Sequence, residues 1–243
     1  GAIGGTTNFL AWGDLPEGKD EPDSLFMPRG VIKKRNVGGV AMAVQENVTE
    51  HVQRAWYQDG DNLHPYKGET KPLQEDPQYR TGGKYSWFKA PRYDGEPCEV
   101  GPLARVLVAY AKGKSEVKEL FDATLKKLEI PVAALFSTLG RTAARGLETV
   151  AIGQAMPGWI MQLIENVKGG DTKTYQPWEM PDKAMGVGLN DVARGSLGHW
   201  IEIDGGKIKN YQYVVPSTWN FGPRDEKGKL GPAEEALTGT PVA

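Results

Sequence analysis

The sequence has 243 residues, with 29 basic and 31 acidic side chains and a formal net charge of −2. This balance gives no reason to expect a nucleic acid or an anionic membrane as partner, because both require a cationic excess or patch. No stretch approaches the roughly 18 consecutive apolar residues of a membrane-spanning helix. Seven Trp, nine Tyr and six Phe exclude a disordered chain.

Residues that ligate metals are scarce. The single cysteine, Cys98, permits neither an intrachain disulfide nor a thiolate cluster. With no base beside it in the sequence, Cys98 is interpreted as a small apolar residue and not as a nucleophile. The three histidines, His51, His64 and His199, include no pair at helical i,i+4 spacing. The sequence therefore predicts no self-contained zinc or iron site.

Residues 1–98 are predicted to be rich in loops, with short strands and one short helix. Glycines and prolines separate apolar runs at 8–12 and 40–44, which are interpreted as brief strands or turns. Thr49 is predicted to cap a helix that ends at Trp56. The segment 60–97 is predicted to lie against a neighbour and not to form a flexible linker, because aromatic residues interrupt it: Tyr66, Tyr79, Tyr85, Trp87, Phe88 and Tyr93.

Residues 99–170 are predicted to form a core of long helices. Apolar residues at i, i+3, i+4 and i+7 predict a helix over 100–111, closed by Gly113 in the left-handed conformation. The same spacing predicts helices over 115–128 and 131–168. Pro157 is expected to kink or break the last of these.

Residues 171–243 are predicted to contain a loop, a β-hairpin and a polar tail. Residues 200–203 and 208–215 alternate with period two around Asp204-Gly205, which is typical of a hairpin. Gly186-Val187-Gly188 lacks the third glycine of a phosphate-binding turn and is interpreted as an ordinary loop. The predicted fold class is α+β, with a predominantly helical core, a small antiparallel hairpin or sheet region and long irregular loops.

Two groups of charged residues have structural explanations. Arg141 and Arg145 lie one helical turn apart, and Glu148 follows three residues on, which predicts a salt-bridged helix face. Two arginines and three acids around the Gly-Pro at the start of the helix over 100–111 are expected to brace a loop against that helix: Arg92, Asp94, Glu96, Glu99 and Arg105.

Two short segments are candidates for a chemical site. Arg194 lies in a predicted turn between small or apolar residues. Its guanidinium stays charged and presents five donors, so it can cover a reacting or anionic group, or alternatively pair with a buried carboxylate. Further on, Ser217 follows a proline at a strand end. It forms either a capped turn or a hydroxyl donor facing a pocket that Val215 and Pro216 wall.

Six segments, in this order, resemble the large subunit of the nickel-iron hydrogenases, particularly the periplasmic uptake type of sulfate-reducing bacteria. They are WFKAPRY (87–93), EVGPLA (99–104), LFSTLGRTAARG (135–146), PWEMP (177–181), RGSLGHWI (194–201) and VVPSTWN (214–220). The resemblance runs along nearly the whole chain, and so many segments in order are more specific than one short motif.

The resemblance implies reversible oxidation of dihydrogen to protons and electrons. In that family four cysteines, in one CxxC pair near each end of the subunit, hold nickel and an iron carrying cyanide and carbon monoxide. This sequence contains neither pair, nor the family glutamate that relays protons near the first pair. We therefore expect an internal part of a longer large subunit, inactive without the remainder.

Site residues also follow from the resemblance. Arg194 matches the arginine above the open metal position, where it polarises dihydrogen or acts as a base in splitting it. Electrostatic stabilisation is the more conservative of these two roles, because the pKa of arginine is so high. Ser217 matches the serine that donates to one iron cyanide, and the backbone around Arg194 serves the other. Ala193 stands where the family commonly has proline, which frees a backbone N–H.

The remaining matches surround the same centre. Leu197, Val215 and Pro216 match the apolar wall around the carbon monoxide. Tyr213 matches the position whose backbone carbonyl binds a nearby magnesium, and Gln212 matches its water-bonding neighbour.

By resemblance, the partners are a small subunit with iron-sulfur clusters and the missing parts of the large subunit. The segment 60–97 is a candidate for contact with either. The expected compartment is the periplasm, with membrane association through partners. The alternative is a metal-free relative that serves as a structural or quinone-proximal subunit of a respiratory complex.

Overall fold

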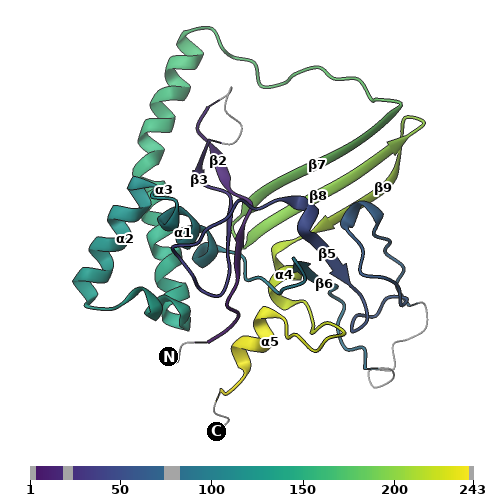
Figure 1. The fold of residues 1–243 in the computed structure, drawn as a ribbon. Helices are drawn as coiled ribbons and strands as arrows, with labels where there is room; N and C mark the ends of the chain where they lie inside the picture. Colours follow the sequence, from purple (N-terminus) through teal and green to yellow (C-terminus); the bar gives the residue numbers. More distant parts are fainter. Residues whose placement is uncertain (1–3, 19–23, 74–82, 241–243) are drawn as a thin grey trace.

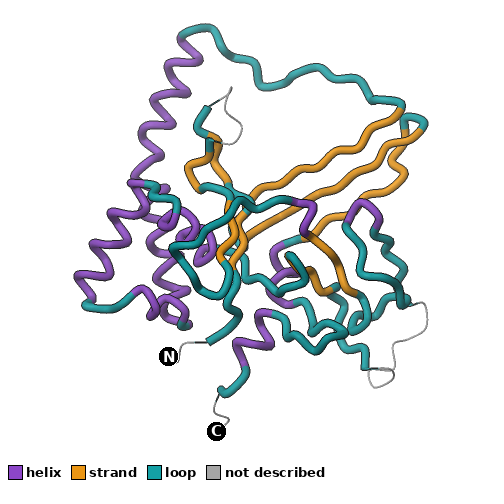
Figure 2. Tube along the Cα trace, in the orientation of Figure 1, coloured by secondary structure: helices purple, strands orange, loops and turns teal. Residues whose placement is uncertain are grey.

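The structure of the protein, a computed structural model, describes residues 4–18, 24–73 and 83–240. Helices make up 35% and strands 25% of the described residues. The long helices lie on one side of the molecule, and short helices lie among the strands (Figure 2). The α+β class is confirmed, but the predominantly helical core is not, because strands occupy much of the chain predicted as loop. Tyr79, one of the aromatic residues expected to pack against a neighbour, lies outside the described residues.

Three helices pack together on one side: α1 (Pro102–Ala111), α2 (Ser115–Leu128) and α3 (Thr138–Lys168) (Figure 1). Gly113 has a φ of 72° and closes the first helical segment as predicted. An apolar core fills the space between the helices and includes Leu107, Phe121 and Ala144, each fully buried.

The third helix differs from the prediction at two points. Pro131 leads into a 3-10 helix, η3 (Val132–Phe136), and α3 begins after Ser137, whose hydroxyl accepts a backbone hydrogen bond in the first turn. The expected break at Pro157 is wrong, because α3 continues through it. Proline removes one hydrogen bond to the carbonyl four residues earlier. That residue, Gly153, is exposed, so water can hydrate the freed carbonyl.

A three-stranded antiparallel sheet, in the order β7-β8-β9, covers the opposite side (Figure 1). Its strands are β7 (Lys183–Val192), β8 (Gly195–Asp204) and β9 (Lys207–Val214). The hairpin prediction is confirmed, although the turn is Gly205-Gly206, with φ of 61° and 67°, and not Asp204-Gly205. Reading 186–188 as a loop is wrong, since these residues lie within β7.

The first hundred residues form short strands that pair across the chain. They are β1 (Phe9–Ala11) with β4 (Gly30–Ile32), β2 (Asp14–Pro16) with β3 (Leu25–Met27), and β5 (Val48–His51) with β6 (Ala90–Tyr93). Two 3-10 helices lie between them: η1 (Gln45–Asn47) and η2 (Pro65–Lys67).

Two predictions for this region are corrected. The helix predicted after Thr49 is wrong, because β6 supplies backbone partners that make residues 48–51 a strand. The strand expected over 40–44 is reduced to a single bridge between Ala41 and Val31.

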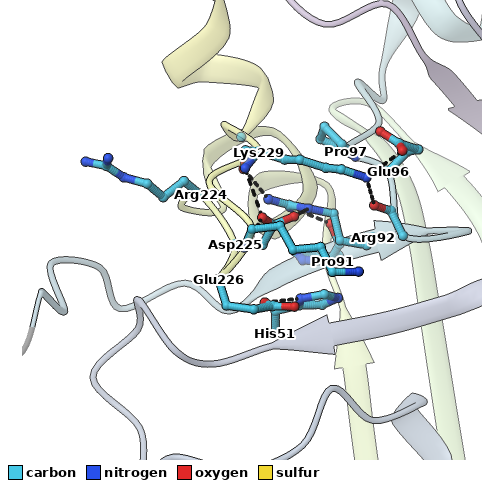
Figure 3. Close-up of polar contacts among 12 residues, drawn as sticks. His51, Pro91, Arg92, Glu96, Pro97, Arg224, Asp225, Glu226 and Lys229 are labelled. Atoms are coloured by element: carbon cyan, nitrogen blue, oxygen red, sulfur yellow. Dashed lines mark hydrogen bonds and ion pairs between the residues drawn. The ribbon is translucent and has the colours of Figure 1, made fainter.

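The segment after β9 forms α4 (Pro216–Phe221) and α5 (Pro232–Leu237), and a buried ion pair anchors the loop between them (Figure 3). Arg92 of β6 donates from Nε to Asp225 Oδ2 at 2.9 Å and from Nη2 to the carbonyls of Pro223 and Lys229 at 3.2 and 2.9 Å. Both charged side chains are at most 1% exposed. Next to them, His51 Nδ1 lies 2.8 Å from Glu226 Oε2. The end of the chain is therefore fastened to β5 and β6.

Two apolar clusters hold these parts together. The first joins α1, α2 and α3 to Phe9, Met27 and Ile32. The second joins β1 to the sheet and α4 through Trp12, Trp200 and other buried residues. Each cluster contains residues from at least two of the predicted stretches 1–98, 99–170 and 171–243. The division of the chain into these three stretches remains a prediction. Among the described residues, no helix is long and apolar enough to cross a membrane.

Candidate functional site

Arg194 and Ser217 line the same pocket, although 23 positions separate them in the sequence. Arg194 lies in the turn between β7 and β8, and Ser217 lies in the first turn of α4. The pocket has a volume of about 340 Å³, and the start of α1 and one face of α3 complete its wall. The two residues named from the sequence therefore lie on one pocket, and the roles expected of them there remain a prediction.

Glycines bring the Arg194 turn against the start of α1. Val192 pairs with Gly195, so Ala193 and Arg194 form a two-residue turn. Gly195 has a φ of 131°, and a Cβ there would lie 2.6 Å from the Gly101 nitrogen. Gly101 has a φ of 124°, and a Cβ on it would lie 3.0 Å from the Arg194 carbonyl oxygen. Only residues without side chains allow this approach.

Asn220 fixes α4 to the backbone just before α1. Its side-chain Oδ1 accepts from Val100 N at 3.0 Å, and its Nδ2 donates to Val100 O at 3.0 Å. This pair of bonds holds α4, and Ser217 with it, beside the first turn of α1. The sequence carries no signal that separates Asn220 from an ordinary loop asparagine, and the prediction missed it.

The pocket is rich in positive charge. Glu99 accepts from Arg141 at 2.8 Å (Nε) and 2.6 Å (Nη2), whereas Arg145 and Arg194 are exposed. Within the described ranges, no hydrogen bond or ion pair engages the Arg194 side chain, so its predicted pairing with a buried carboxylate is wrong. The salt-bridged face predicted for α3 is also wrong, because Glu148 pairs with a residue of α1 instead.

The other residues predicted for the site do not line the Arg194 pocket. Val215 lines a neighbouring pocket of about 310 Å³ with Gln212 and Tyr213. Leu197, Ala193 and Pro216 do not line either of these two pockets. Ala193 directly precedes Arg194 in the turn, and Pro216 begins α4.

The neighbouring pocket has a polar wall, of which only Gln212 was named from the sequence. Lys89 Nζ lies 3.4 Å from Glu50 Oε2, 3.2 Å from Gln212 Oε1 and 3.2 Å from Thr70 Oγ1. Burial raises the pKa of Glu50, and the Lys89 ammonium opposes that shift. Glu50, Thr70, Lys89 and Gln212 are separated by at least 19 positions in the sequence, so no local spacing groups them.

Cys98 is buried and lines neither pocket. Burial raises the pKa of its thiol to about 12. We expect iodoacetamide to leave Cys98 unmodified in the native subunit from pH 7 to pH 9, because the thiolate is the reactive form and does not accumulate there. Peptide mass spectrometry measures the modification. Modification that begins in denaturant supports this; native modification that rises over the same pH range contradicts it.

The described residues contain no group of three or more His, Cys, Asp or Glu that could hold a metal ion. The pocket nevertheless offers what a covered, anionic metal cluster needs from its surroundings. The Arg194 guanidinium and the Ser217 hydroxyl both line it, and neither side chain makes a hydrogen bond or ion pair within the described part of the chain. These groups fit the surroundings of such a cluster and supply none of its ligands.

Known proteins of similar sequence and structure share one family. The uptake hydrogenase large subunit of Bradyrhizobium diazoefficiens is 44% identical over 259 residues, which cover 97% of this chain and 44% of the relative. The hydrogenase-1 large chain of Escherichia coli is 37% identical over 262 residues, covering 96% and 43%. This chain thus spans less than half the length of these relatives.

The solved structures agree with the sequences. The reduced, active form of the Ni-Fe-Se hydrogenase from Desulfomicrobium baculatum matches with a TM-score of 0.80 and 33% identity, covering 99% of this chain and 48% of that one. Residues 1–243 match the family described as nickel-dependent hydrogenase. The chain therefore belongs to the large-subunit family of the nickel-dependent hydrogenases.

Proposed function

We propose that this chain is part of the catalytic large subunit of a [NiFe] hydrogenase, which oxidises dihydrogen reversibly. The observation that carries the proposal is the meeting of Arg194 and Ser217 on one pocket. A nickel-iron centre with cyanide and carbon monoxide, when bound, supplies the chemistry that converts dihydrogen into protons and electrons. Its cysteine ligands lie outside this sequence, so the segment alone is inactive.

In this proposal Arg194 acts through its charge. The guanidinium faces the pocket without a structural partner among the described residues, so its donors are available to a ligand. A fixed positive group stabilises negative charge that develops during a reaction, and it does so without exchanging a proton. Ser217 presents a neutral hydroxyl donor, which suits the nitrogen of a cyanide ligand.

Replacing Ser217 with alanine should shift the cyanide infrared bands of the complete enzyme and lower turnover by up to about 10-fold, the equivalent of one neutral hydrogen bond. Nickel and iron contents should stay unchanged, because the residue is not a ligand. Ser115→Ala removes a hydroxyl from α2 and serves as the matched control. Unshifted bands in Ser217→Ala would remove the proposed donor.

Exposed apolar surfaces support the proposed partners. The outer half of α3 contacts the rest of the protein through Trp159, whose ring packs edge-on against Phe26. On its other sides it exposes Met156, Ile160, Leu163 and Val167 by 50 to 62%. We assign this surface to the missing part of the large subunit. Trp87 and Phe88, in the segment 60–97, are 50% and 38% exposed, and we assign them to the small iron-sulfur subunit. Copurification of a Trp87→Lys large subunit with the small subunit tests the second assignment.

We also propose that magnesium binds beside the Tyr213 carbonyl. The support is the buried polar wall of the adjoining pocket, where Lys89 contacts both Gln212 and Glu50. Magnesium prefers oxygen ligands and retains several waters, which polar groups of this kind can orient. Magnesium analysis of the purified complete subunit, with Gln212→Leu for comparison, tests this proposal. Equal magnesium in both proteins would contradict the role of Gln212.

The periplasm is the proposed compartment, with membrane association through partners, on resemblance alone; cell fractionation tests it. The metal-free alternative is less favoured, because the matching family is nickel-dependent. The complete gene and a nickel and iron assay of the intact subunit decide between the two. Two CxxC pairs that bracket this segment, with one nickel and one iron bound, support the hydrogenase. Their absence overturns it.

A further inference from the structure

A buried charged cluster lies directly behind the Arg194 turn, and the proposed function does not use it. It consists of Arg105 of α1, Glu148 of α3 and Asp191 of β7, which are 5%, 8% and 1% exposed. Three separate elements therefore meet at one guanidinium. Burial of three charged side chains is costly unless each is paired and hydrogen-bonded, so their contacts indicate what they hold in place.

Arg105 joins helix α3 to the turn. Its Nε and Nη2 donate to the two carboxylate oxygens of Glu148, the latter bond at 2.9 Å. Its Nη1 donates to the Val192 carbonyl at 2.8 Å, and Nη2 also points to the Ala193 carbonyl at 3.4 Å. These carbonyls belong to the two residues that immediately precede Arg194. One planar side chain thus spans α3 and the turn.

Asp191 secures the base of the same turn. Its Oδ2 accepts from Gly13 N at 2.7 Å, and its Oδ1 accepts from the Ser196 hydroxyl at 3.0 Å. Asp191 and Ser196 face each other across β7 and β8, so both strands are held where the turn begins. Asp191 Oδ1 also lies 3.6 Å from Arg105 Nη1.

The charges in this cluster support one another. Burial by itself lowers the pKa of Arg105, but the hydrogen bonds and charge of Glu148, together with the charge of Asp191, raise it overall. The guanidinium therefore remains charged. Lysine cannot replace it, because an ammonium lacks the planar fork that bonds a carboxylate and two carbonyls at once.

We propose that Arg105 is a positioning residue, which holds the Val192 and Ala193 carbonyls so that Arg194 faces the pocket. The inference rests on the proposed function, because only that function gives the orientation of Arg194 toward the pocket a role in the reaction. The turn itself is exposed at residues 192–194, and this cluster contacts it from the protein side, beside the close approach of Gly101. Small displacements of a positioned group can lower turnover by about 100-fold.

The test is Arg105→Lys in the complete large subunit, assembled with its small subunit. We expect turnover to fall about 10- to 100-fold with an unchanged KM for dihydrogen and unchanged nickel and iron contents. Amide hydrogen exchange at residues 192–195 should become faster. Arg92→Lys is the matched control, since it removes another buried guanidinium that bonds a carboxylate and carbonyls, away from the turn. It should leave exchange at 192–195 unchanged.

A double-mutant cycle separates this inference from the proposed function. If Arg105 acts through Arg194, Arg105→Lys combined with Arg194→Lys should lose no more turnover than Arg194→Lys alone. Normal turnover in Arg194→Lys would overturn the role of Arg194, while faster exchange at the turn would still support the positioning contact. Unchanged exchange in Arg105→Lys, or additive losses in the double variant, would overturn the inference.

A second variant keeps the test decisive if Arg105→Lys does not assemble. Glu148→Gln retains Arg105 and weakens its anchor on α3, because a neutral amide replaces the carboxylate that accepts two bonds. It should speed amide exchange at 192–195 and lower turnover less than Arg105→Lys is expected to. Exchange at wild-type rates in this variant overturns the inference.

Discussion

Replacing Arg194 with lysine in the complete subunit should lower dihydrogen oxidation about 100-fold, which is typical for the loss of one preorganised hydrogen-bond donor. Nickel and iron contents should not change. The side chain makes no hydrogen bond or ion pair among the described residues, so its replacement removes no structural contact. Lysine keeps the positive charge but loses the fixed, five-donor geometry. A fall in turnover would therefore show that the orientation of the donors matters in addition to the charge.

Turnover with an artificial electron acceptor, measured beside metal analysis of the same preparation, checks this expectation. Arg224→Lys is the matched control, because Arg224 is an exposed arginine outside the pocket. It should behave as the wild-type enzyme does. Wild-type turnover in Arg194→Lys would mean that the guanidinium has no part in the reaction.

Asp225→Asn should lower the free energy of unfolding by about 3–5 kcal/mol, since it leaves a buried arginine without its counter-charge. Arg92 and Asp225 are at most 1% exposed, so water cannot replace the lost charge. Asp225 Oδ1 also accepts from the backbone nitrogens of Lys227 and Lys229 at 3.0 and 2.9 Å. Asparagine can keep these two bonds through its remaining oxygen, so the loss is confined to the contact with Arg92 Nε.

Denaturant-induced loss of structure in the assembled enzyme measures this effect. The matched control is Asp94→Asn, which breaks the ion pair between Lys33 and Asp94, whose side chains are 46% and 39% exposed. Exposed pairs contribute at most about 1 kcal/mol, so this variant should stay close to the wild type. An equal fall in the free energy of unfolding for the two variants would show that burial does not determine how much the Arg92–Asp225 pair contributes to stability.

The helices were predictable because their signals are local. Apolar spacing and Gly113 define α1 and α2 without reference to the rest of the chain. Strand β7 was not predictable in this way, because its residues are largely exposed and include glycines, and its pairing with β8 makes it a strand. Residues 48–51 likewise become a strand through β6, about forty positions later, which overrides the local preference for a helix.

The family resemblance named Arg194 and Ser217 from the sequence, and in the structure both residues line one pocket. Their roles at a metal centre remain a prediction. The supporting residues were not predictable, because the local rule pairs charges three or four positions apart on one helix. Glu148 instead pairs with Arg105, 43 positions away on another helix, and Asn220 bonds the backbone of Val100 across 120 positions. Such contacts depend on the packing of the whole chain.

The bond between Gly13 and Asp191 also bears on the order in which the protein forms. It connects positions 178 apart, and the bond from Arg105 to the Val192 carbonyl connects positions 87 apart. Contacts of such long sequence separation form late, because the intervening chain must first be brought together. During synthesis on the ribosome, α1 and α2 therefore have time to fold before the hairpin emerges. This side of the pocket stays open in the nascent chain until then.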